Sequence, residues 1–348
     1  MQNKRILYVD LIKIIAIFLV VLVHVSSPIL SGYNKISIQW WWTANIYDSI
    51  ARVCVPLFFM ISGYLLLSKN IPLLIFYKNR LPKILIAMTF WVIFYIFFAK
   101  YIEHKDINIL KTLFLAINHS QYNHLWFLYT YLGVLISIPI LAALVKHAEK
   151  SIIYLLILLW LINVMIVPDL NYYFHLKLSG HLPFGSYIGY FLIGFLLGNL
   201  NVSKKLYVSS IIIFFIITSI ISIGTYYLTV YSGHLNQQLY SYARLPVFLQ
   251  SIAAFIILKY IGQLKIIDNN EIITRTLSII SGTVFGIYLI HPIFLRLMID
   301  GTFGFVLHGV NSHVLFTIPF TTILAFIFSF ITVYFLQKIP YLKYIVPK

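Results

Sequence analysis

The chain has 348 residues, of which 61% are hydrophobic and only 10% charged, with a mean hydropathy of +0.93. Soluble domains carry about 25% charged residues, so this composition excludes a water-soluble globular fold and predicts a membrane protein. The net charge of +16 does not indicate nucleic-acid binding, because Lys and Arg recur in short clusters between apolar runs, as they do in the loops that set membrane topology.

Apolar runs of spanning length predict an all-α bundle of about ten transmembrane helices, forming one domain over residues 1–348. The runs lie near residues 11–31, 46–67, 84–100, 125–145, 151–168, 185–200, 206–230, 245–262, 279–298 and 314–336. The first run follows basic residues, as in a signal peptide. It is long enough to span, however, and no small-x-small cleavage site follows it, so we expect a retained first helix.

The distribution of Lys and Arg predicts that both termini face the cytoplasm. With the N-terminus inside, 16 of the 25 basic residues fall in cytoplasmic segments and 8 fall outside. The cytoplasmic set is Lys4, Arg5, Lys69, Lys78, Arg80, Lys83, Lys146, Lys150, Lys204, Lys205, Lys259, Lys265, Arg275, Lys338, Lys343 and Lys348. The sequence assigns no oligomeric state.

The first run contains two ionisable residues, Lys13 and His24, which the bilayer tolerates only when they are paired or face a polar cavity. They are 11 residues apart, which is three turns plus about 20° and a rise of roughly 16 Å, so they share one helix face. Alternatively, Lys13 reaches the inner headgroups beside Asp10, and His24 forms a helix-packing hydrogen bond.

The second run carries Asp48 and Arg52 at its outer end, together with the only cysteine, Cys54. Asp48 and Arg52 are spaced to form a surface ion pair, although Arg52 lies at a depth where it can also hold an anionic or sugar ligand. We expect a kink at Pro56 and close packing at Gly63. The sixth run is short, and Gly189, Gly194 and Gly198 are spaced for close helix contact.

The fourth run opens with His124 and Trp126, a pair that is also common as a headgroup anchor. In the ninth run Tyr288 and His291 share a face, and Pro292 leaves the carbonyl of Tyr288 without its helical donor, as in an ordinary helix kink. His124, Tyr288 and His291 map to the outer half of the bundle, as do His24 and Arg52. This convergence predicts a polar site there.

In chain order these segments resemble the acyltransferase-3 family of integral-membrane O-acyltransferases, and the resemblance covers nearly the whole chain. The matching segments are Lys13 followed by His24, which fits a basic-x10-His signature, Arg52–Tyr64, His124–Leu128 and Gly286–Pro292; Arg80–Lys83 resembles the family's paired basic residues. The chain is most similar to the branch of WecH-like O-acetyltransferases of enterobacterial common antigen. It departs from the family in having Lys13 and Lys83, which meet phosphate as point charges rather than as a guanidinium fork.

The resemblance implies a multi-pass protein of the inner (cytoplasmic) membrane that transfers an acetyl group from cytosolic acetyl-CoA to a glycan hydroxyl. His24, with Lys13, is the implied catalytic pair, and His24 takes the hydroxyl proton. Lys13, Lys78, Arg80 and Lys83 are the implied CoA-binding residues. Acceptor binding and oxyanion support are assigned to Arg52, His124, Trp126, Tyr288 and His291. Acetyl-CoA, the glycan and membrane lipid are the expected partners, and no metal or nucleic acid is expected.

Three other functions fit parts of this pattern. A transporter or glycan exporter would use the buried polar residues to line a pathway, although the sequence shows no inverted repeat. A membrane scaffold would have no use for intramembrane Lys and His. An acyltransferase that uses succinyl-CoA would differ only in the volume of its donor pocket.

Overall fold

The computed structural model of the protein describes residues 6–69, 72–178, 185, 187–307 and 313–348, and this part of the chain is all-helical. Its α-helices are α1 (Leu7–Leu30), α2 (Ile38–Ala51), α3 (Cys54–Leu67), α4 (Leu73–Tyr101), α5 (Ile109–Leu115), α6 (Trp126–His147), α7 (Lys150–Leu161), α8 (Val167–Phe174), α9 (Ile188–Gly198), α10 (Lys204–Ser232), α11 (Leu245–Gly262), α12 (Lys265–Asp268), α13 (Glu271–Ser281), α14 (Val284–Ile299) and α15 (Val314–Leu336). A π-helical turn at Ile162–Ile166 joins α7 to α8.

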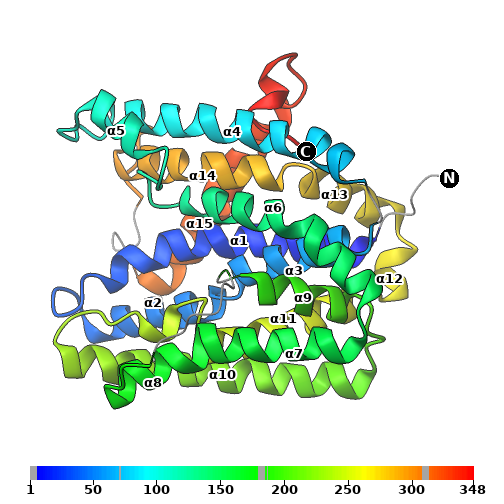
Figure 1. The fold of residues 1–348 in the computed structure, drawn as a ribbon. Coiled ribbons are helices and arrows are strands. Elements are labelled where there is room, and N and C mark those ends of the chain that lie inside the picture. Colours follow the sequence, from blue (N-terminus) through cyan, green and yellow to red (C-terminus); the bar gives the residue numbers. More distant parts are fainter. Residues whose placement is uncertain (1–5, 70–71, 179–184, 186, 308–312) are drawn as a thin grey trace.

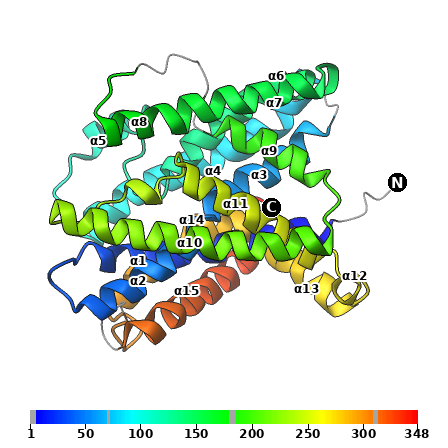
Figure 2. The ribbon, with the colours of Figure 1, turned by 90° about the horizontal axis from the view of Figure 1, so that it is seen from below.

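The long helices run nearly along one direction, with α4 on one side of the bundle and α10 on the opposite side (Figure 1). Between them lies α1, which contacts α2, α3, α11, α13, α14 and α15. In the view from below, α6 and α7 form the edge opposite α15 (Figure 2). Because α1 is surrounded in this way, polar side chains on it face protein rather than lipid.

The predicted fold class, an all-α membrane protein, is confirmed. In the described residues eight helices, counting joined neighbours as one, are long and apolar enough to span a bilayer; the bent pair α13 and α14 would be a ninth. The remaining predicted run, 185–200, contains the 11-residue helix α9, which is too short to span alone. Residue 186 of that run lies outside the described residues, as do Lys4 and Arg5.

Two of the predicted spans are interrupted. The helical segment that contains Pro56 begins earlier than expected, at Ile38, and its break falls at Arg52–Val53 rather than at Pro56. Pro56 lies in the first turn of α3. An N–H in that turn has no acceptor within the helix, so a proline there removes no helical hydrogen bond. The α13–α14 pair bends by 63° at Gly282–Thr283, before Pro292, and α14 continues through that proline.

The glycine spacing of α9 is confirmed as a close-packing device. A Cβ on Gly194 would lie 2.0 Å from the carbonyl oxygen of Met60, and one on Gly63 would lie 2.1 Å from that of Phe191. The backbones of α3 and α9 therefore touch. Such approach is possible only where the side chain is absent.

A buried lysine caps the end of this short helix. Lys259 was counted among the cytoplasmic loop cations, but it is only 3% exposed and donates hydrogen bonds to the carbonyls of Leu197, Gly198 and Leu200 at 2.9, 2.6 and 2.7 Å. The last carbonyls of a helix have no partner within it. The Lys259 ammonium supplies that partner inside the bundle, so α9 can end there without leaving polar groups unsatisfied.

The beginning of α1 and the end of α15 lie at the same end of the bundle. Ser281 donates to Asp10 at 2.6 Å, and Gln337 donates to the carbonyl of the neighbouring Gly282 at 2.9 Å. The C-terminal segment folds back over this end, where Trp91 of α4 donates to the carbonyl of Ile345 at 2.7 Å.

Candidate active site

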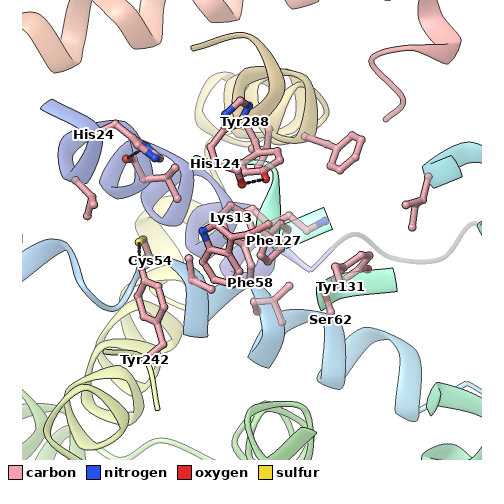
Figure 3. A pocket seen from close by; sticks show the side chains of 18 of the residues that line it. Lys13, His24, Cys54, Phe58, Ser62, His124, Phe127, Tyr131, Tyr242 and Tyr288 are labelled. Atoms are coloured by element: carbon pink, nitrogen blue, oxygen red, sulfur yellow. Dashed lines mark hydrogen bonds between the residues drawn. The ribbon is translucent and has the colours of Figure 1, made fainter. Parts of the chain in front are cut away.

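A cavity of about 830 Å³ runs through the bundle beside α1. Lys13 and Ser31 both line it, so it follows α1 for 18 residues, or roughly 27 Å of helix. Side chains from α3, α4, α6 and α14, and from the segment that precedes α11, complete its wall (Figure 3). One cavity thus connects the two ends of the bundle past His24.

One end of the cavity is strongly cationic. It is lined by five basic residues, Lys13, Lys69, Arg80, Lys83 and Lys348. Lys83 and Lys69 are exposed, and Lys13 and Arg80 are half-buried, so the charges form a partly open mouth. Convergent cations of this kind bind phosphate groups. Lys78, expected among them, is exposed on α4 and does not line the cavity.

The other end of the cavity is aromatic and neutral. Trp126 of α6 lies almost parallel to Tyr242, with ring centroids 6.0 Å apart. Asn123 and Gln237, which lie close to these two residues in the sequence, also line the cavity. Figure 3 shows the Tyr242 side chain directed toward Cys54, and the two groups are 3.7 Å apart. Flat rings beside amide groups are suited to a polar ligand with apolar faces, such as a sugar.

His24 lines the cavity between these two ends. The imidazole is half-buried, and its Nδ1 lies 2.9 Å from the carbonyl oxygen of Val20, one turn earlier on α1. A carbonyl only accepts hydrogen bonds, so Nδ1 carries the proton. The neutral ring then has its lone pair on Nε2.

His291 lies behind His24 rather than on the cavity wall. It is fully buried, with 0% exposure, and its Nε2 lies 3.1 Å from Nδ1 of His24. We expected it to bind the acceptor; instead it contacts the ring of His24. Helix α14 is the reason, because it packs against α1 and presents this position inward.

His124 lines the cavity and has no hydrogen-bond partner for either ring nitrogen in the described part of the chain, although it is only 2% exposed. Its ring lies 6.5 Å from that of His24 and 4.8 Å from that of Tyr95, centroid to centroid. The Tyr288 hydroxyl donates to its backbone carbonyl and fixes the segment, as Figure 3 shows. Unpaired buried nitrogens are costly, and both nitrogens of this ring are available to a polar group in the cavity.

Arg52 and Asp48 form the expected ion pair, but inside the protein rather than at the surface. Their exposed fractions are 8% and 0%, and Asp48 also accepts a hydrogen bond from Ser26 at 2.9 Å. The guanidinium lies 4.2 Å from the ring centroid of Tyr240 and lines the cavity. Because its charge is already matched, Arg52 is better suited to a hydroxyl than to an anion.

The cavity therefore brings together most of the predicted site residues, namely Lys13, His24, Arg52, Arg80, Lys83, His124, Trp126 and Tyr288. Sequence reasoning missed its neutral lining residues, including Asn123, Gln237 and Tyr242, because polar residues in loops are too common to signal a site. Lys69 and Lys348 had been counted only toward topology. Despite the three clustered histidines, no group of three or more His, Cys, Asp or Glu residues in the described segments is placed to hold a metal.

Comparison with known proteins identifies the family of the chain. A family model described as an acyltransferase domain, that of the acyltransferase-3 family, matches residues 6–336, which is nearly the whole chain. No curated protein and no solved structure matches the chain.

Proposed function

The chain belongs to the acyltransferase-3 family, and from that premise we propose that it transfers an acetyl group from cytosolic acetyl-CoA to a hydroxyl of a cell-surface or lipid-linked glycan. The observation that carries the proposal is the cavity itself. It connects a cationic mouth to an aromatic, neutral end, with His24 between them.

The donor enters at the cationic mouth. The phosphates of CoA meet Lys13, Arg80 and Lys83, while Lys69 and Lys348 add to the same field. From there Val20, Phe58 and Ile61 offer an apolar wall to the flexible arm that carries the thioester. The roughly 16 Å rise from Lys13 to His24 is the distance over which this arm extends.

His24 is the general base. Its Nε2 lone pair removes the proton of the acceptor hydroxyl as the oxygen attacks the thioester carbonyl, and direct transfer then needs no acyl-histidine intermediate. His124 faces the same cavity, and one of its unpaired nitrogens carries a proton that can stabilise the oxyanion.

The acceptor occupies the aromatic end. The paired rings of Trp126 and Tyr242 offer a flat surface to a sugar, and Asn123 and Gln237 offer amide groups to its hydroxyls. The buried Arg52 adds further N–H groups without a net charge, since Asp48 neutralises it.

The membrane placement follows from the same chemistry. Acetyl-CoA is made in the cytosol, so we assign the cationic mouth to the cytoplasmic side of the cytoplasmic membrane. Helix α1 begins and α15 ends at this end of the bundle, so both termini would then face the cytoplasm. The two-to-one excess of Lys and Arg supports the same orientation.

The test is acetyl transfer by the full-length protein in membrane vesicles. With radiolabelled acetyl-CoA, the wild type should release CoA and label glycan in the same vesicles. His24→Ala should lower kcat by about 10²- to 10⁴-fold, the usual contribution of a general base, while the protein remains folded in the membrane. Near-normal labelling by this variant would contradict the role of His24.

One observation also favours transport, because the cavity reaches both ends of the bundle. The same vesicles separate the two functions. A transporter would move glycan without consuming acetyl-CoA, whereas the proposed enzyme consumes one acetyl-CoA for each acetyl ester formed. Replacing acetyl-CoA with succinyl-CoA identifies the acyl group, and we expect the acetyl donor to be preferred.

A further inference from the structure

Hydrogen bonds fix the protonation of two neighbouring imidazoles. Nδ1 of His291 lies 3.1 Å from the carbonyl oxygen of Ile287, so this nitrogen must be the donor. In a neutral ring its Nε2 then carries a lone pair. That lone pair lies 3.1 Å from Nδ1 of His24, whose proton is already fixed by the carbonyl of Val20.

The Nδ1–H of His24 therefore has two acceptors, a backbone carbonyl on its own helix and the imidazole of His291 on α14. The Val20 carbonyl lies one turn before His24 in α1 and is also the regular acceptor of the helix backbone at that position. His291 is thus the acceptor devoted to this proton. Its full burial and its bond to Ile287 hold the ring in place.

We propose that His291 is a positioning residue, which orients the imidazole of His24 and stabilises the cation that His24 becomes during acyl transfer. The inference rests on the proposed role of His24 as general base. It follows the logic of hydrolase triads, in which a third group orients the base through the nitrogen that does not touch the substrate. In this protein a second histidine takes the place of the usual carboxylate.

His24 takes up one proton and returns it within each acyl transfer. The acceptor hydroxyl gives its proton to Nε2 of His24 while its oxygen forms a bond to the thioester carbon. In the resulting imidazolium, Nδ1–H still donates to Val20 and His291, so the positive charge is shared with two acceptors. When the carbon–sulfur bond breaks, Nε2–H returns the proton to the thiolate sulfur of CoA, and His24 is neutral again.

The experiment compares His291→Leu with His291→Gln in the full-length protein, using radiolabelled acetyl-CoA and the glycan of the same membrane vesicles. Leu removes the acceptor, whereas the Gln carbonyl oxygen can replace it. We expect Leu to lower kcat by about 10- to 100-fold, with the KM for acetyl-CoA changed less than 3-fold. Gln should recover at least 10-fold of the lost kcat.

A purely structural role gives a different pattern. If both variants lose folded protein in proportion to their activity, or if Gln is no better than Leu at equal folded protein, the inference is wrong. His24→Ala separates the role of His24 from the role of His291. Activity in His24→Ala overturns the proposed base, whereas loss of activity there combined with a fully active His291→Leu overturns only the role of His291.

Discussion

The two faces of α3 differ sharply although they lie on one 14-residue helix. Met60, Gly63 and Tyr64 face α9, and there the backbones touch because the glycines of the contact leave no room for a Cβ. Phe58, Ser62 and other residues half a turn away line the cavity instead.

This contrast explains how a lipid-embedded bundle makes an internal space. Tight, dry packing on one face of a helix fixes its position, because helices in lipid are held by close contact rather than by the hydrophobic effect. Bulky rings on the other face keep the neighbouring helices apart. Phe58 and Phe127, with centroids 6.1 Å apart, mark this separation across the cavity between α3 and α6.

The largest expected effect comes from breaking the buried pair beside the cavity. Arg52→Met leaves the Asp48 carboxylate unpaired inside the bundle, and the free energy of unfolding should fall by about 3–5 kcal/mol. Thermal unfolding in detergent measures this loss. The matched control, Asp48→Leu with Arg52→Met, should regain most of the stability but not the acetyl transfer; an unchanged Tm in Arg52→Met would contradict the buried pairing.

A smaller effect is expected at the seam between α3 and α9. Gly194→Ala forces a Cβ against the backbone of Met60, and overpacking of this kind costs about 1–3 kcal/mol. The control is Gly133→Ala on α6, where a Cβ meets nothing within 4 Å. We expect a lower Tm only in Gly194→Ala, with activity reduced in step with folded protein. Equal Tm values for the two variants would mean that the seam is not tight.

The smallest effect is expected at the cationic mouth of the cavity. Arg80→Ala with Lys83→Ala removes two cations from the cavity wall, and the KM for acetyl-CoA should rise about 10-fold, or about 1.4 kcal/mol, while kcat changes little. Lys78→Ala removes a cation from the same helix but from outside the cavity, so its KM should stay at the wild-type value. A loss of kcat with unchanged KM in the double variant would place the donor elsewhere.

Most of the helices, and the group of polar residues that line the cavity, could be predicted from the sequence because lipid makes both easy to recognise. Apolar runs mark the spans, and intramembrane Lys13 and His24 stand out since they are costly without a polar cavity. The sequence did not reveal that Arg52 is buried with its partner, because i, i+4 spacing is the same at a surface and in a core. Nor did it separate His124 from His291. Which of the two faces the cavity depends on how α6 and α14 pack, and this is a property of tertiary contacts.

Whether the acyl donor occupies the cavity can be measured on the two faces of α3 in one experiment. In a Cys54→Ser background, which has no other thiol, Ser62→Cys places a cysteine on the cavity and Met60→Cys places one in the seam. N-ethylmaleimide should modify the cysteine at 62 and not the one at 60, and saturating acetyl-CoA should protect the cysteine at 62. Modification at 62 that acetyl-CoA leaves unchanged would contradict the claim that the acyl donor occupies this cavity.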